Sequence, residues 1–409
     1  MDEGKELQTV SVAVTVEDVG KVTSTLPPLG PIDKAAERRL KWKIDLLILP
    51  MLCGTFFYSS MGKSDLAFAA IAGMLEELKM TPSQYSAAAN YFLVGFIIFQ
   101  LPGTLLLRIV GPARLIGIAC AAWGFFTCLQ VVIHSYAALA GLRTLIGVSE
   151  GLGNGVVFYL SFWYTYDELA TRSGIFWGST ALASSFNGLV SYGIQKNLNG
   201  KNGWLAWRWI FLIEGIMPIT FGIFLYFALP ATPETARLGF SQADRELATK
   251  RSRRSHNPEQ PRIRPKAVLK CFLSPVFWLF TVQFCGYHFC SASMTNFTPI
   301  IIKDLGYTSV KAQLMSSLVF ACAFVSVIIF CRVADVTNKR GITLAASLVP
   351  SVIGYAMLLA SENANVRFTG ACLFAVGNYP GTVLILSWLT MSTAGYTTRC
   401  CHVVLSEMA

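Results

Sequence analysis

Repeated apolar runs of about 20 residues constrain this chain more than any other feature of its sequence. As an α-helix, such a run is long enough to cross the roughly 30 Å hydrocarbon core of a bilayer. Runs of this kind follow one another almost without interruption between residues 44 and 390. We therefore predict an all-α polytopic membrane protein, with spans at 44–61, 86–107, 112–132, 136–162, 173–195, 208–229, 274–297, 312–331, 342–360 and 367–390.

Composition separates this chain from soluble proteins that share its positive charge. Hydrophobic residues make up 54% of the 409 residues and charged residues 14%, with a formal net charge of +10. The basic residues gather in particular loops, as membrane topology requires, so nucleic acid is excluded as a partner. No CxxC pair occurs among the cysteines, and the histidines are too scattered for a metal site or a nucleophile–base arrangement. The sequence predicts no enzyme, no metal and no cofactor.

The distribution of Lys and Arg also sets the predicted orientation. Arg38, Arg39, Lys41 and Lys43 precede the first apolar run, which places the N-terminus in the cytosol. The longest loop contains SQADRELATKRSRR, in which Ser241 can cap a short helix. We predict a disordered cytosolic tail over 1–42, a six-helix bundle over 43–229, a cytosolic loop over 230–273, an incomplete helix bundle over 274–399 and a divergent tail over 400–409.

An acid stands in the middle of the fourth apolar run, RTLIGVSEGLGNGVVFYLSFWY (143–164). A carboxylate at the centre of a membrane helix costs roughly 3 kcal/mol, so Glu150 is expected to face a partner or a wet cavity. Arg143 lies seven residues earlier, on nearly the same face of the helix. Gly147, Gly151 and Gly155 form a face against which another helix can pack closely. Two hypotheses follow: a structural Arg–Glu pair beside a packing stripe, or a proton or substrate site.

Several stretches carry a resemblance to a known family. The turn CRVADVTNKRG (331–341) resembles the G-x-x-x-D-R-x-x-[RK]-R turn of the major facilitator superfamily. Other stretches are similar to the fungal branch of its anion:cation symporter family, the allantoate and nicotinate permease group: ERRLKWKIDLLILPML (37–52), the Glu150 run, WRWIFLIEGI (207–216) and LSWLTMSTAGYTTR (386–399). The resemblance implies a major facilitator fold with a six-helix first half. Only about four spans are left for the second half, so a C-terminal truncation is expected.

The chain departs from the family's pattern at two places where substrate would be met. Gly62, Lys63, Ser64 and Asp65 stand where the family usually has aspartate, arginine, threonine and asparagine, and Asn154 stands where proline is common. Lys63 retains a positive charge but loses the forked guanidinium, and an exposed loop lysine is the alternative interpretation. A satisfied core histidine is likewise the alternative for His288. The candidate substrate-binding residues are Lys63, Asp65, Asn154, Tyr287 and His288.

The resemblance also implies roles for two other groups of residues. Glu150 would carry a proton during transport, under the influence of Arg143. The turn between the eighth and ninth spans would act as a conformational latch, with Asp335 meeting the positive N-terminal end of the fifth helix near Thr171 and Arg172. The latch residues are Arg332, Asp335, Lys339 and Arg340.

The function that the resemblance implies is secondary active transport of a small organic anion or metabolite, coupled to protons, by alternating access. A transport-inactive truncated carrier, a nutrient receptor and a metabolite exporter are the alternatives. The expected partners are a small-molecule substrate (a carboxylate, a vitamin-like compound or a secondary metabolite), protons and membrane lipid. The expected location is the plasma membrane, as a multi-pass protein, with the vacuolar membrane as the alternative.

Overall fold

The computed structural model describes residues 33–153, 155–164, 166–236, 239–255, 275–337 and 339–392, and all regular elements in these ranges are helices. The all-α prediction is therefore confirmed. Predictions that concern residues 1–32, Asn154, 256–273 and 400–409 lie outside the described residues. The first helix begins at Lys34, so residues 34–42 are helical, whereas the sequence had assigned them to a disordered tail.

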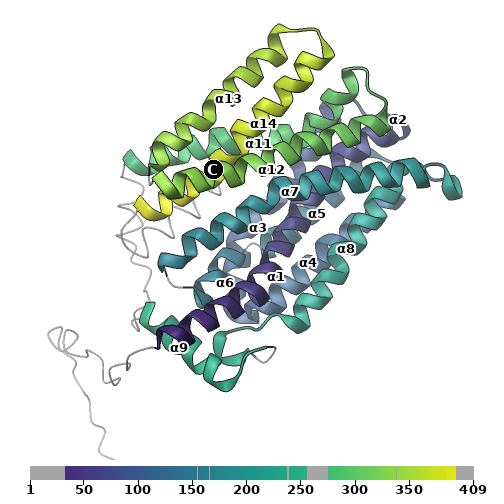
Figure 1. The fold of residues 1–409 in the computed structure, drawn as a ribbon. Coiled ribbons are helices and arrows are strands. Elements are labelled where there is room, and N and C mark those ends of the chain that lie inside the picture. Colours follow the sequence, from purple (N-terminus) through teal and green to yellow (C-terminus); the bar gives the residue numbers. More distant parts are fainter. Residues whose placement is uncertain are drawn as a thin grey trace, which may run out of the picture.

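The first helix group fills the lower part of Figure 1 and contains the helices of the first six predicted spans. The predicted fourth span is divided between two helices, because one ends at Gly153 and the next begins at Val156. The elements of this group are α1 (Lys34–Ala69), η2 (Ala70–Met74), α2 (Leu75–Glu77), α3 (Pro82–Val110), α4 (Pro112–Leu129), η3 (Gln130–Val132), α5 (Tyr136–Gly153), α6 (Val156–Trp163), α7 (Tyr166–Leu198), η4 (Lys201–Gly203) and α8 (Ala206–Ala228).

The second helix group fills the upper part of Figure 1 and packs along the first through α7, α11, α12 and α14. Two short elements of the connecting segment, η5 (Pro233–Thr235) and α9 (Gln242–Ser255), lie at the end of the molecule where α1 begins. The elements of the second group are α11 (Pro275–Asp304), α12 (Ser309–Thr337), α13 (Arg340–Ala360) and α14 (Ala364–Ser392).

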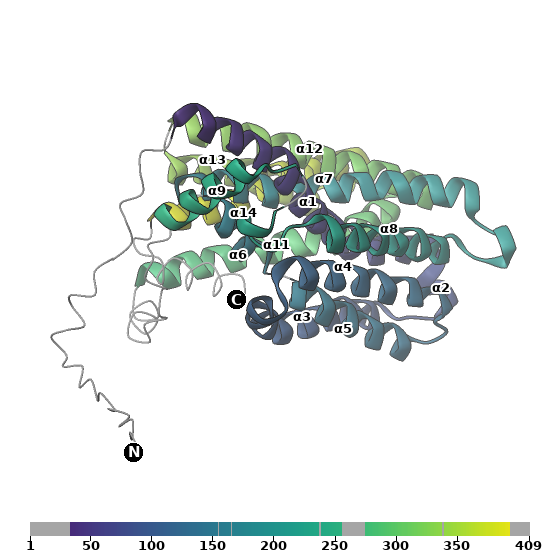
Figure 2. The ribbon, with the colours of Figure 1, turned by 90° about the horizontal axis from the view of Figure 1, so that it is seen from below.

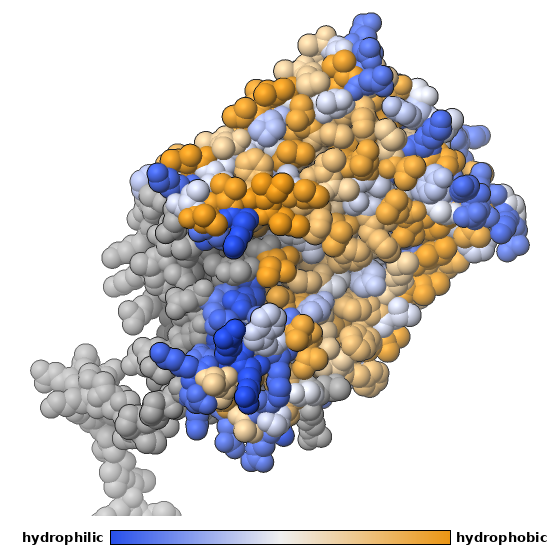
Figure 3. All heavy atoms as spheres, viewed as in Figure 1, coloured by the Kyte–Doolittle hydropathy of each residue, from blue (hydrophilic) through white to orange (hydrophobic). Residues whose placement is uncertain are grey.

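Within the described residues, six helical stretches are long and apolar enough to cross a membrane by length and composition. Many large apolar side chains are exposed, including Ile109, Phe227, Leu279 and Leu359, which are 80%, 77%, 71% and 72% exposed. Figure 3 shows apolar residues over most of the visible face and polar residues at the two ends of the helices. This distribution suits a bilayer, whose hydrocarbon contacts the apolar belt while water contacts the ends. The six stretches are 34–77, 112–132, 206–228, 309–337, 340–360 and 364–385.

Local signals in the sequence explain where several helices begin. α3 begins with a capping box, in which Thr81 Oγ1 accepts from the Gln84 amide at 3.3 Å and Gln84 Oε1 accepts from the Thr81 amide at 3.0 Å. The predicted cap of α9 is confirmed, because the Asp244 amide donates to Ser241 Oγ at 3.2 Å. The Ser241 amide donates in return to Asp244 Oδ2 at 3.0 Å. Both caps satisfy amide groups that a helix start otherwise leaves unpaired.

Glycines bring α3 and α5 into backbone contact, as the stripe in the sequence predicted. A Cβ atom added to Gly147 would collide with the carbonyl oxygen of Phe92, and one added to Gly151 would collide with that of Phe96. Gly95 on α3 lies equally close to the backbone of α5. Since small residues allow helices to pack backbone to backbone in lipid, this contact fixes the position of α5 within the first helix group. Figure 2 shows the two helices side by side.

The two helix groups are joined by polar contacts at the end of the molecule opposite the start of α1. Tyr85 Oη on α3 donates to the Asn296 carbonyl oxygen on α11 at 2.7 Å. Lys303 Nζ, near the end of α11, lies 3.6 Å from Glu76 Oε1 on α2. These contacts close one end of the space between the groups.

Candidate functional site

A cavity of about 570 Å³ lies between the two helix groups. This volume is in the usual range for a small-molecule site. Helices of the first group contribute charged side chains to its wall, whereas helices of the second group contribute uncharged polar and aromatic ones. Its polar lining includes Lys63, Arg143 and Glu150 from the first group and His288, Asn296 and Tyr379 from the second.

Glu150 forms an ion pair with Lys63 in the wall of this cavity. The distance from Lys63 Nζ to Glu150 Oε2 is 3.5 Å, and Ser59 Oγ donates to the same carboxylate oxygen at 2.8 Å. Ser59 and Lys63 are four residues apart on α1 and therefore share the helix face that meets α5. Both residues line the cavity, but the Lys63 side chain, at 34% exposed, is more open than that of Glu150, at 4%.

Aromatic rings surround the free side of the Lys63 ammonium group. Its Nζ lies 6.0 Å from the centroid of Phe56, 5.5 Å from that of Phe92 and 5.4 Å from that of Phe96. The faces of such rings attract a cation and leave it few water partners. A positive charge held in this way attracts an anionic ligand that enters the cavity.

Arg143 acts on the charge of Glu150 but does not form the ion pair with it that the spacing along the helix suggested. The ion pair of Glu150 is with Lys63, while Arg143 Nη1 donates to the carbonyl oxygen of Gly62 at 3.1 Å. Arg143 is 3% exposed, and the carboxylates that act on its charge are those of Asp65 and Glu150. Arg143 therefore lies between two acids rather than being paired with one.

Of the two candidate residues in the second helix group, the structure places His288 in the cavity wall and Tyr287 in the core. The His288 ring opens into the cavity and stacks on Phe284, with centroids 5.4 Å apart and planes at 16°. Tyr287 is 6% exposed and packs against Gly381, so it belongs to the core of the second group rather than to the described cavity wall. Asn154 lies outside the described residues.

Asp65 also lies away from the cavity, in a polar cluster that the sequence did not reveal. Asp65 is 1% exposed, and its Oδ1 accepts from Asn187 Nδ2 at 2.7 Å. The carboxyl group of Glu214 on α8 is close enough to act on that of Asp65. Glu214 interrupts the apolar run 208–229 as Glu150 interrupts its own, so the same rule for acids inside membrane helices would have found it.

The latch residues lie in the second helix group, at the same end of the molecule as the start of α1 (Figure 1). Asp335 Oδ1 lies 3.5 Å from Arg340 Nη2, and Asp335 is largely exposed. Arg332 and Lys339 are also exposed. The expected contact between Asp335 and Arg172 is not formed among the described ion pairs, because Arg172 instead forms a two-point pair with Asp45, at 2.8 and 3.2 Å.

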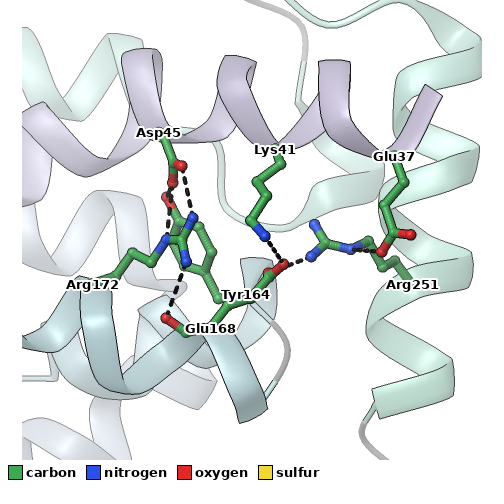
Figure 4. A network of polar contacts seen from close by, with 7 residues as sticks. All are labelled: Glu37, Lys41, Asp45, Tyr164, Glu168, Arg172 and Arg251. Atoms are coloured by element: carbon green, nitrogen blue, oxygen red, sulfur yellow. Dashed lines mark hydrogen bonds and ion pairs between the residues drawn. The ribbon is translucent and has the colours of Figure 1, made fainter. Parts of the chain in front are cut away.

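A second charge network ties α9 to the first helix group (Figure 4). Arg251 on α9 pairs with Glu37 of α1 at 2.8 Å and with Glu168 of α7. Lys41 Nζ approaches Glu168 at 2.6 Å. Burial raises the pKa of Glu168, but the hydrogen bond from Lys41 and the charge of Arg251 outweigh it and hold this pKa below its usual value. Arg251 is 4% exposed, whereas its partner Glu37 is 36% exposed, so the centre of this clamp is buried and its edge is open.

The described residues hold no cluster of His, Cys, Asp or Glu side chains with the arrangement of a metal site. Their chemistry is instead that of charge pairs and hydrogen bonds around a cavity. Such a site binds and releases ions and small molecules and contains no arranged nucleophile among the residues named above.

Sequence comparison connects the chain to known transporters. The family profile described as Major Facilitator Superfamily matches residues 51–398. The MFS transporter prlL of a fungal species is 31% identical over 392 residues, which cover 92% of this chain and 78% of the relative. The major facilitator-type transporter hxnP of Emericella nidulans is 29% identical over 395 residues, with coverage of 92% and 79%.

Solved structures share the fold at low sequence identity. A bacterial homologue of the human lysosomal transporter Spinster, in an inward-facing and occupied conformation, superposes with a TM-score of 0.64 at 14% identity, covering 88% of this chain and 77% of that one. A D-xylose–proton symporter gives a TM-score of 0.64 at 14% identity, with coverage of 90% and 87%. Likeness at this level concerns the fold alone.

Proposed function

The chain belongs to the major facilitator superfamily, a family of membrane transporters, and from this premise we propose that it carries a small organic anion together with protons by alternating access. Membrane transport agrees with its fungal transporter relatives and with its fold. The finer assignment to the anion:cation symporter family is part of the proposal. So are the identity of the substrate and location in the plasma membrane.

The observation that carries the proposal is the Lys63–Glu150 pair in the cavity wall. The pair gives the cavity a cation whose carboxylate partner is itself able to bind a proton. An incoming anion competes with Glu150 for Lys63, and a proton on Glu150 removes that competition. Anion and proton binding thus favour each other, which is the requirement for symport.

His288 is the proposed contact from the opposite wall. Its ring faces the cavity and is stacked on Phe284, so an anion held by Lys63 would have a hydrogen-bond donor from the second helix group. A ligand that touches both groups favours the conformation in which they approach each other. This contact would link binding to reorientation of the carrier.

Alternating access requires the open end of the cavity to close after the substrate binds. The polar contacts of Tyr85 with Asn296 and of Lys303 with Glu76 join the groups at one end. At the other end, Asp335 and Arg172 are both engaged within their own groups. We assign this arrangement to the inward-open state and propose that the latch residues make their contacts across the groups when that end closes.

The test is uptake by the purified chain in proteoliposomes with an alkaline interior. A panel of radiolabelled monocarboxylates, dicarboxylates and heteroaromatic acids would identify the anion, with neutral amides of the same compounds as matched controls. The proposal predicts accumulation of at least one anion, abolished by a protonophore and absent for its amide. Accumulation of the amide with the same dependence would refute the role of Lys63. If none of the panel were accumulated at any pH gradient, proton-coupled anion transport would be refuted.

A further inference from the structure

Two buried acids in the first helix group have no part in the proposed substrate site. Asp65 on α1 and Glu214 on α8 are 1% and 3% exposed, and hydrogen bonds from Asn187 and Ser191, one turn apart on α7, reach the two carboxyl groups, which are close enough to act on each other. Neither residue lines the described cavity. Two carboxylates supply only acceptors, so a hydrogen bond between them requires a proton on one of the four oxygens.

Two buried acceptors in and beside this pair have no hydrogen-bond donor among the described residues. Asn187 Nδ2 on α7 donates to Asp65 Oδ1 and to Ser64 Oγ, both at 2.7 Å, and Ser191 Oγ donates to Glu214 Oε1 at 3.3 Å. Glu214 Oε2 and Asn187 Oδ1 are enclosed and have no partner among the described residues. A buried acceptor without a donor is costly, and a proton on the carboxyl pair supplies the donor that Glu214 Oε2 lacks.

The charges around the pair also indicate that one proton is bound. Asp65, Glu214 and Glu150 are three acids in one connected buried cluster, whereas Arg143 and Lys63 are its two cations. Because an uncompensated charge inside a membrane protein is expensive, one bound proton brings the cluster to neutrality. Two neighbouring helices add no further charge to the contacts described above. α3 contributes the phenol of Tyr85 beside Arg143, and α7 contributes uncharged side chains.

We propose that Asp65 and Glu214 form a second proton-binding site, in which two carboxyl groups share one proton behind Arg143. Arg143 lines the cavity and acts on Asp65, so it separates this proton from the substrate and from Glu150. The site depends on Asp65, the position at which the chain departs from the asparagine usual in the family it resembles. It exists whatever the substrate is, and its test requires no transport.

Infrared difference spectroscopy on the purified chain in lipid nanodiscs tests the proposal, because a protonated carboxyl group has a C=O stretching band that a carboxylate lacks. The variants are Asp65→Asn and Glu214→Gln, which preserve shape and leave the remaining acid balanced by Arg143. Each should lose the band of one carboxylic acid at neutral pH. Ser191→Ala is the matched control: it retains both acids and should keep the band at a shifted frequency, since a hydrogen bond to Glu214 is gone.

Every outcome of this experiment decides the question. Equal bands in the wild type and both variants would mean that both acids are ionised, and the site would not exist. A band lost in only one of the two variants would place the proton on the acid that this variant replaces and refute sharing. A band that sodium removes at constant pH, with potassium as the control, would make the pair a sodium site. If a variant fails to fold, the frequency in Ser191→Ala decides, because an unshifted band would belong to another acid.

Discussion

Replacing Glu150 by glutamine should strengthen anion binding and abolish proton-driven accumulation in the same protein. The amide keeps the size of the side chain and accepts the hydrogen bond of Ser59, but it neither carries charge nor titrates. Lys63 then loses the carboxylate with which a substrate anion must compete. The variant therefore separates binding from coupling.

The geometry of the pair sets the size of the expected effect. At the Nζ–Oε2 distance of 3.5 Å, an effective dielectric constant of about 20 gives an attraction of about 5 kcal/mol. Because Lys63 is 34% exposed, solvent screening reduces this value to about 2 kcal/mol. An attraction of that size corresponds to a decrease of about 30-fold in the dissociation constant of the anion.

Two assays on one preparation check the prediction. Isothermal titration with the anion identified by the uptake screen measures the dissociation constant, and proteoliposomes with an alkaline interior measure accumulation. Counterflow of labelled against unlabelled anion should persist, because exchange needs no net proton movement. Glu246→Gln removes an acid from the surface of α9 and serves as the matched control, with both properties unchanged. Normal accumulation with normal pH dependence in Glu150→Gln would make Glu150 a packing residue and refute the reasoning.

Three further predictions concern the clamp, the latch and the glycine contact. Since the pKa of Glu168 is lowered in the folded protein, its stabilising contribution is complete above its ordinary value of 4.5 and is lost as the pH falls through the lower folded value. Arg251→Gln should reduce this pH dependence of the melting temperature, because Lys41 still pairs with Glu168, with a loss of about 3 kcal/mol. Asp335→Asn should slow uptake without weakening binding, and an unchanged rate with weaker binding would exclude a latch. Gly147→Ala should cost about 1–3 kcal/mol in thermal unfolding, whereas Gly141→Ala, which meets no neighbour, should be neutral.

The fold could be predicted from sequence because lipid allows few solutions. A run of about 20 apolar residues in a bilayer has to satisfy its backbone within itself, so run length and basic loops largely define the helices. The division of the fourth span after Gly153 was missed, because the hydropathy of 136–162 is continuous across the break. The start of α1 at Lys34 was missed because its first turns are polar and lie before the apolar run.

The site was harder to predict because its pairs join helices that are distant in sequence. Spacing along α5 suggested Arg143 as the partner of Glu150, since helical periodicity relates only residues of one helix. The observed partner, Lys63, lies on α1, and nothing in a single sequence states which face of α1 meets α5. The resemblance places Asp65 at the substrate, because it stands in the stretch 62–65 where the chain departs from the family's pattern. Two positions beyond Lys63 on a helix, however, a side chain points toward a different neighbour.

The fixed position of Lys63 determines how membrane voltage would act on the carrier. In the empty state, the cation is balanced by Glu150; in the loaded state, it is balanced by the anion while Glu150 holds the proton. With a monovalent anion, both states have the same charge, and neither reorientation step moves net charge across the field. A divalent anion adds one negative charge to the loaded state, worth about 2.3 kcal/mol for each 100 mV. Electrical recording would therefore report the valence of the substrate before its chemical identity is known.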